Sequence, residues 1–168
     1  NSGAWDDSRR VAKRMIEVFS DSEYLISPSG SCTGMVREQF PALFANEPET
    51  LAKAQALADR TYEFVEFLVK VLGVEQPDAR FDGRLTYHYT CHLRGIGITN
   101  EAEQLIQRLD GVTYVPLDQM DQCCGFGGAF AVKQADISGS MVADKVDAII
   151  ASEADAVVVN DTGCIMNI

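Results

Sequence analysis

Four cysteines carry the chemistry that this sequence is best suited to perform. Cys91 stands alone, Cys123 and Cys124 are adjacent, and Cys164 comes last, with 31 residues between Cys91 and the pair and 39 between the pair and Cys164. Thiolate sulfur is a soft ligand that suits iron in iron–sulfur clusters and also zinc. Adjacent side chains of a strand point to opposite faces, so both sulfurs of the pair can reach one centre only where the backbone bends. The pair therefore predicts a metal-binding loop, and the alternative is a buried pair that packs as small apolar residues.

Glycines accompany these cysteines in both motifs. Glycine adopts backbone conformations that other residues avoid, so the chain can bend here and bring N–H donors close to the sulfurs. The run after the pair lacks the G-x-G-x-x-G spacing of a dinucleotide site, so we do not expect flavin or nicotinamide to bind this chain. The glycines expected to line the cofactor site are Gly125, Gly127, Gly128 and Gly163.

Three further residues are candidate ligands. His92, next to Cys91, could donate a proton or a hydrogen bond to sulfur, or complete a zinc site. Asp161, three residues before Cys164, is either an oxygen ligand or a turn residue that bonds its own backbone, and turn chemistry favours the second. Cys32 follows a Ser-Pro-Ser-Gly-Ser turn and would lie in the first turn of a helix, where N–H groups stabilise a thiolate, or it packs beneath that turn.

Other charged or polar neighbours have two interpretations each. His88 precedes Cys91 on a predicted strand, where a core position is as good an explanation as a ligand. Arg94 and Lys133 could offset the charge of the thiolates, or they could simply be solvated surface residues.

Strands and helices alternate along the chain, which predicts an α/β fold with a mainly parallel sheet flanked by helices. Ligands of such sheets bind at the carboxyl ends of strands. Cys91, the pair and Cys164 each follow a predicted strand, so we expect them to meet at one edge of the sheet. The fully apolar run 156–159 predicts a strand that is buried on both faces. The expected elements are helices over 6–20, 32–40, 101–109 and 137–152, strands over 24–26, 84–90, 112–115 and 156–159, a helix that Pro41 breaks, a long amphipathic element over 49–73 and a loop over 75–83.

A short internal repeat suggests how the chain is divided. The order helix, acidic turn, apolar strand, glycine, cysteine occurs around 21–33 and again around 152–166. We therefore predict two related cysteine-rich repeats: 1–46 is the C-terminal part of a truncated first repeat, 47–83 is a helical connector, and 84–168 is the second repeat. On this interpretation the chain is a fragment of a longer protein.

Composition narrows the class of protein. The 168 residues are 46% hydrophobic and carry a net charge of -11, which is typical of a globular protein and makes nucleic acid an unlikely partner class. No run approaches the roughly 18 apolar residues of a membrane helix, and the N-terminus has no signal-peptide pattern. We expect a cytoplasmic protein without an integral membrane segment. Five cysteines, an odd number, favour ligands or redox thiols over a disulfide framework.

The motifs resemble those of the cysteine-rich CCG domain family. The matching runs are 87–94 around Cys91, 123–133 after the pair, and Gly163-Cys164. That domain is found in a cysteine-rich component of heterodisulfide reductase, in glycolate oxidase iron–sulfur subunits and in the lactate utilisation protein A family, and the chain is most similar to the last of these. The run 27–32 looks like the end of a first repeat, so the resemblance covers essentially the whole chain. It departs from heterodisulfide reductase at Asp161, where that relative has a cysteine.

The resemblance implies an iron–sulfur electron-transfer subunit of a complex that oxidises L-lactate or a similar 2-hydroxy acid. Cys91, Cys123, Cys124 and Cys164 would hold the cofactor, with a [4Fe–4S] cluster as the expected type and zinc as the alternative. Two other hypotheses stay open: a thiol–disulfide redox module of heterodisulfide-reductase type, and a zinc-stabilised scaffold without catalytic function. The expected partners are the other subunits of a lactate or glycolate oxidation complex. We expect no activity from the isolated chain.

Overall fold

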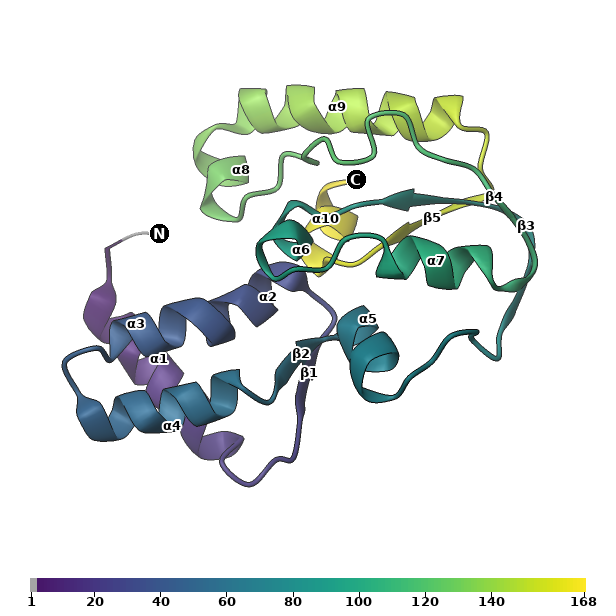
Figure 1. The fold of residues 1–168 in the computed structure, drawn as a ribbon. Coiled ribbons are helices and arrows are strands. Elements are labelled where there is room, and N and C mark those ends of the chain that lie inside the picture. The colour runs from purple at the N-terminus through teal and green to yellow at the C-terminus, as the bar shows by residue number, and fades with distance from the viewer. Residues whose placement is uncertain (1–2) are drawn as a thin grey trace. The chain divides into compact units, whose positions relative to one another are not determined.

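The computed structural model describes residues 3–168 and divides them into two compact units, of which the first ends at Phe64 and the second runs from Val65 to Ile168. All the strand pairings described are parallel, and helices flank the strands in each unit (Figure 1). The predicted α/β class with a mainly parallel sheet is therefore confirmed. The division into two related repeats and a connector stays a prediction.

The first unit is a helical cluster built around a two-stranded sheet. Residues spaced three or four apart on its helices turn one side inward, and these side chains form a core that includes Ala12, Ile16, Phe40 and Leu57. β1 pairs with β2, with Leu25 opposite Thr61. Its elements are α1 (Trp5–Val18), β1 (Leu25–Ser27), α2 (Gly30–Gly34), the π-helix η1 (Met35–Gln39), α3 (Phe40–Leu43), α4 (Pro48–Ala58) and β2 (Thr61–Glu63).

Two sequence predictions in this region are wrong. Pro41 does not break the helix there: η1 runs directly into α3, which continues past Pro41 to Leu43. The amphipathic element over 49–73 is not continuous: α4 stops at Ala58 and β2 follows, then α5 (Phe64–Glu66) and the π-helix η2 (Phe67–Val71). The helical spacing of apolar residues continues through β2, but pairing with β1 overrides it.

The second unit is a three-stranded parallel sheet in the order β4-β3-β5. The chain leaves the central strand β3 for β4 on one side and then crosses to β5 on the other, so the strand order reverses at the carboxyl end of β3. Figure 1 shows α7 and α9 on opposite sides of the sheet, as right-handed crossovers require. Its elements are β3 (Arg80–His88), α6 (Cys91–Gly95), α7 (Glu101–Gln107), β4 (Asp110–Tyr114), α8 (Ala129–Lys133), α9 (Ala135–Ala151), β5 (Ala156–Val159) and α10 (Thr162–Asn167).

Burial in this sheet is concentrated in the second half of β3. Leu85 and Tyr87 are buried there and pack with Leu93 of α6, with Ile98 in the loop that follows and with apolar residues of α7. The strand begins at Arg80, within the predicted loop. The sequence does not predict this start, because the first residues of the strand alternate between exposed and half-buried and give no apolar signal. The prediction that 156–159 is buried on both faces is wrong. β5 is an edge strand that is paired only with β3 in the sheet, and its residues are exposed or half-buried.

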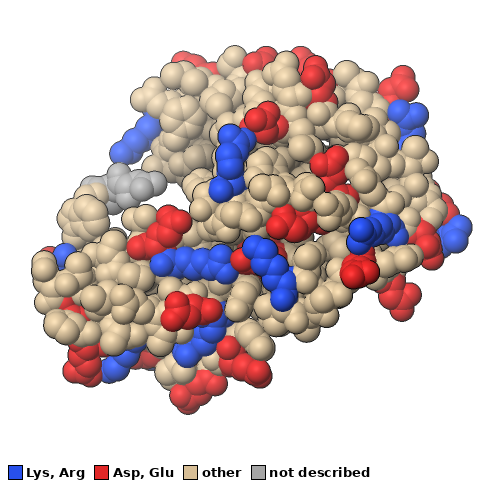
Figure 2. Space-filling model, viewed as in Figure 1, with Lys and Arg blue, Asp and Glu red and all other residues tan. Residues whose placement is uncertain are grey.

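Charged side chains of both signs are interspersed on the face seen in Figure 2. Several are matched in ion pairs, such as Lys13 with Glu47 at 2.7 Å. The negative net charge therefore does not gather into one patch on that face. Among residues 3–168, no helix combines the length and the apolar character needed to cross a membrane.

Candidate metal centre

The sheet brings three strand exits to one place in the second unit. Cys91 is the first residue of α6, three residues after β3, and Cys164 lies in the first turn of α10 after β5. The loop between β4 and α8 carries Cys123 and Cys124. The carboxyl end of β3, where the strand order reverses, is the position at which open α/β sheets bind their ligands.

The buried part of the site consists of His88, Cys124 and Cys164. Their ligand atoms, one nitrogen and two sulfurs, all lie within 4.8 Å of one another. The residues are 0%, 1% and 9% exposed. Neither ring nitrogen of His88 makes a hydrogen bond of good geometry within residues 3–168, although the imidazole is near enough to Cys124 to lower the pKa of that thiol. A metal ion or cluster at the two sulfurs would offer the imidazole a partner.

The outer part of the site consists of Cys91 and Cys123. Cys91 is exposed and Cys123 is half-buried, and the Gly125 N–H group donates a hydrogen bond of 3.3 Å to Cys123 Sγ. Partial burial of its thiol raises the pKa of Cys91 to about 11, and the charge of Cys123, which shares a hydrogen bond with it, adds to this effect. The two cysteines are therefore close neighbours, and the charge of Cys124 also raises the pKa of Cys91.

The two buried thiols, Cys124 and Cys164, shift each other's pKa in opposite directions. A hydrogen bond with Cys164 holds the pKa of Cys124 well below its usual value, and His88 and the Phe126 N–H group act in the same direction, while burial opposes them. The same hydrogen bond with Cys124, followed by burial, raises the pKa of Cys164. Two thiolates so close together repel each other unless a cation neutralises them. Two buried sulfurs with an imidazole beside them, and two further cysteines nearby, are a donor set that fits a metal ion or cluster.

Gly125 fixes the loop that presents the cysteine pair. Its φ of +85° lies in the left-handed region, and an added Cβ would come within 2.7 Å of the Ser138 carbonyl oxygen on α9. The Ser138 hydroxyl in turn donates a hydrogen bond of 2.9 Å to the Gly125 carbonyl. The loop is thus pinned to α9 at a point where only glycine fits.

The other predicted glycines have different surroundings. Gly127 and Gly128 form the exposed turn that leads into α8. The N–H group of Gly163 donates to Asp161 Oδ1 at 2.9 Å and not to sulfur, which corrects our expectation for that residue. Gly163 is needed for space instead, because an added Cβ would overlap the ring of Phe126.

Asp161 is the N-cap of α10. It is 7% exposed, and its carboxylate accepts the Gly163 N–H hydrogen bond just described, which agrees with the turn interpretation. Its charge also helps to raise the pKa of Cys164. It is not part of the group of three that lies within 4.8 Å.

Replacement of Asp161 separates the two interpretations. We expect Asp161→Ala to lower the free energy of unfolding by roughly 1 kcal/mol, because the cap hydrogen bond is lost, and to leave the metal content unchanged. Asp161→Asn keeps a cap oxygen and is the control, for which we expect little change. Urea denaturation and metal analysis of the purified variants provide the two readouts. Loss of metal in both variants would instead make Asp161 a ligand.

Two buried polar residues are prominent here, and one of them, Lys145, is not singled out by the sequence patterns. His88, for which a core position and a ligand role are equally good explanations in the sequence, lies beside both buried sulfurs. Lys145 is fully buried, although lysine is usually a surface residue. A signal for its burial exists in the sequence, since Lys145 is spaced four residues from Met141 and four from Ile149 on the apolar side of the predicted helix.

The cations close to the cysteines in sequence lie at the surface. The Arg94 guanidinium pairs with Asp121 at 3.3 Å, with both side chains largely exposed, and Lys133 is exposed at the end of α8. The alternative ligand His92 is exposed on α6 and is not in the group of three. Each of these residues is better described as a surface group of the second unit.

Cys32 belongs to the first unit. It lies in the first turn of α2, as predicted, and its N–H group donates to Ser29 Oγ at 3.3 Å. The residue is exposed and borders an apolar hollow of about 470 Å³ between α1, β1 and η1. The metal centre described above is built entirely from residues of the second unit.

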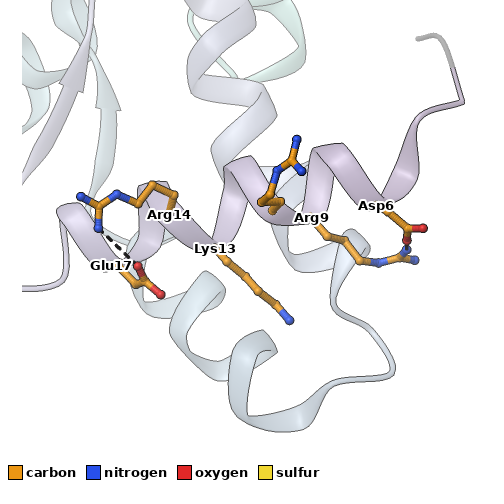
Figure 3. A pocket seen from close by; sticks show the side chains of 6 residues that line it. Asp6, Arg9, Lys13, Arg14 and Glu17 are labelled. Carbon is orange, nitrogen blue, oxygen red and sulfur yellow. Dashed lines mark hydrogen bonds and ion pairs between the residues drawn. The ribbon is translucent and has the colours of Figure 1, made fainter.

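A second hollow of the first unit, on α1, is lined by charged side chains (Figure 3). Its cations are matched by carboxylates: Arg9 by Asp6 at 3.1 Å, and Arg14 by Glu17 at 3.5 Å. Each of these ion pairs is neutral as a whole. The hollow therefore does not present the unbalanced positive charge that an anion site needs.

Comparison with known proteins shows which family the sequence belongs to. A family model described as "Cysteine-rich domain", CCG, matches residues 85–168. "Lactate utilization protein A" of Lysinibacillus sphaericus (strain C3-41) is 45% identical over 168 residues, which cover 99% of this chain and 73% of that protein. The protein of the same name from Bacillus subtilis (strain 168) is 46% identical over 169 residues, which cover 100% of this chain and 71% of the relative.

Proposed function

The chain belongs to the cysteine-rich CCG family that includes the lactate utilization proteins A, and from this membership we propose that it is an iron–sulfur subunit of a complex that oxidises L-lactate or a similar 2-hydroxy acid. The observation that carries the proposal is the buried group of His88, Cys124 and Cys164, with Cys91 and Cys123 on the neighbouring loops at the carboxyl ends of the sheet strands. These four cysteines are the proposed ligands. A [4Fe–4S] cluster held there would supply one-electron storage and release.

The surrounding residues suit such a role. The N–H groups of Gly125 and Phe126 point hydrogen bonds at Cys123 and Cys124, and such bonds stabilise charge on sulfur. Cys124 and Cys164 are shielded from water, while Cys91 lies at the surface. The side of the site formed by Cys124 and Cys164 is therefore closed to water. The side formed by Cys91 faces the solvent, from which a redox partner would approach.

Zinc remains a second candidate because of His88. A buried imidazole within 4.8 Å of two sulfurs is typical of tetrahedral zinc sites with mixed ligands. In that case the centre would hold the loops together without redox chemistry. The third possibility is a thiol–disulfide module, which the adjacent pair Cys123-Cys124 and the neighbouring Cys91 would serve.

We also propose that substrate oxidation takes place on partner subunits and that this chain passes electrons. The absence of a dinucleotide fingerprint in the sequence supports that division of labour. A cytoplasmic location is proposed because clustered free thiols persist in a reducing compartment.

The two-repeat organisation is likewise a proposal, with 1–46 and 84–168 as the related parts. A local likeness supports it: Ser29 caps α2 three residues before Cys32, and Asp161 caps α10 three residues before Cys164.

Metal analysis of the protein purified without oxygen tests the proposed function. We expect about four irons and about four acid-labile sulfides per chain, with broad visible absorbance that is bleached by a one-electron reductant. One tightly held zinc without sulfide would replace the electron-transfer role by the scaffold role. Protein that binds no metal even after reconstitution with iron and sulfide would leave the thiol–disulfide module.

A further inference from the structure

Lys145 lies under the loop that presents the cysteine pair. It projects from α9 and is 0% exposed. Its Nζ donates a hydrogen bond of 2.6 Å to the Gln119 carbonyl oxygen and approaches the Met120 carbonyl oxygen at 3.5 Å. These are consecutive residues just before Gln122-Cys123-Cys124, so one ammonium group holds the backbone that leads into the pair.

The backbone at this contact is strained. Gln119 has a φ of +49°, a left-handed conformation that costs a residue with a side chain roughly 1–2 kcal/mol. A strained turn persists only where its surroundings compensate for the cost. The hydrogen bond from Lys145 to the carbonyl of that same residue is such a compensation.

Burial lowers the pKa of Lys145, and the negative groups near it oppose this effect. The negative groups that act on it are Asp121, Cys124, Cys91 and Cys123. The carboxylate of Asp121 is engaged at the surface with Arg94, and the ion pairs found within residues 3–168 do not include Lys145. Burying an ammonium ion is costly, and here the carbonyl oxygens of Gln119 and Met120 and the negative charge of Asp121 and the cysteines offset that cost.

We propose that Lys145 is a positioning residue of the thiolate site, which anchors the 119–122 segment to α9 and supplies the buried positive charge that offsets the four thiolates. The second half of this proposal rests on the proposed function, because it concerns an iron–sulfur cluster bound by those cysteines. A fixed positive charge close to such a cluster stabilises the reduced form, which carries one more negative charge.

The charge is tested by redox titration of three chains: wild type, Lys145→Met and Lys133→Met. Lys133→Met removes the same charge from an exposed position and controls for net charge. We expect Lys145→Met to make reduction of the cluster about tenfold less favourable, which is about 59 mV for one electron, and Lys145→Arg to restore the wild-type value. Equal potentials in Lys145→Met and Lys133→Met would overturn the electrostatic half. If Lys145→Met fails to fold, Lys145→Gln removes the same charge and carries the same expectation.

The anchoring is tested by hydrogen exchange on the full chain as purified, whatever metal it holds. We expect backbone amides within 117–124 to exchange at least about tenfold faster in Lys145→Met than in wild type, and those of β3 to be unaffected. Unchanged protection of 117–124 would overturn the anchoring half. A wild-type protein without iron would refute the proposed function alone, and the exchange measurement would still decide whether Lys145 anchors the loop.

Discussion

A Cys124→Ser chain will retain little or none of the iron and sulfide that wild type binds. Cys124 is the most buried of the four cysteines and the one that contacts both Cys164 and His88, so its sulfur cannot be replaced from solvent. A serine hydroxyl is a hard ligand that stays protonated near neutral pH and binds iron poorly. Iron and acid-labile sulfide are measured on protein purified without oxygen, together with the visible spectrum.

The matched control for this variant is Cys32→Ser, which makes the same atomic change in the first unit. Cys32 is exposed on α2 and outside the metal centre, so we expect this chain to bind as much iron as wild type. Two results would contradict the assignment: Cys124→Ser protein with at least half of the wild-type iron, or loss of iron in both variants to the same extent.

A Gly125→Ala chain will be less stable by roughly 2–4 kcal/mol, within the range of severe single substitutions. The new methyl group needs a left-handed backbone and a place 2.7 Å from the Ser138 carbonyl oxygen and 3.0 Å from Met141 Cβ. Neither α9 nor the loop can yield without disturbing the hydrogen bond between Ser138 and Gly125. Urea denaturation followed by circular dichroism measures the loss, and metal content falls with it because Cys123 and Cys124 directly precede the displaced turn.

Gly139→Ala is the control for the stability measurement. Gly139 lies within α9, and an added Cβ there would meet nothing within 4 Å. Alanine is the better helix former, so this chain gains roughly 0.5–1 kcal/mol. A Gly125→Ala chain as stable as wild type would mean that the loop is not held against α9 in solution.

The sequence predicts best where the signal is local and chemically specific. Cys91, Cys124 and Cys164 could be placed at one edge of the sheet because each follows a strand and strands of a parallel sheet end together. Asp161 could be interpreted as a turn residue because an aspartate before a glycine bonds its own backbone. Neither conclusion needs knowledge of which elements touch.

The sequence predicts poorly where tertiary contacts decide. β2 continues the apolar spacing of the helix before it and becomes a strand only because β1 is there to pair with it. His88 and Lys145 are polar residues within apolar patterns, and what makes them important is the neighbour that the fold places against them. That neighbour is sulfur from elsewhere in the chain for His88, and the backbone of Gln119 and Met120 for Lys145. Burial of a polar residue can be suspected from spacing, but its partner cannot.

Of the four cysteines of the metal centre, the one that solvent reaches most easily is not the one whose thiol is most readily deprotonated. Cys91 is the most exposed of these thiols, and its pKa is raised, so it carries little of the nucleophilic thiolate form. Cys124, the thiol with the depressed pKa, is enclosed by protein. Oxidants attack thiolates that they can reach, and neither Cys91 nor Cys124 combines an exposed sulfur with a lowered pKa. A newly synthesised chain waiting for its metal would in this way be protected from irreversible oxidation at the residue on which assembly of the centre most depends.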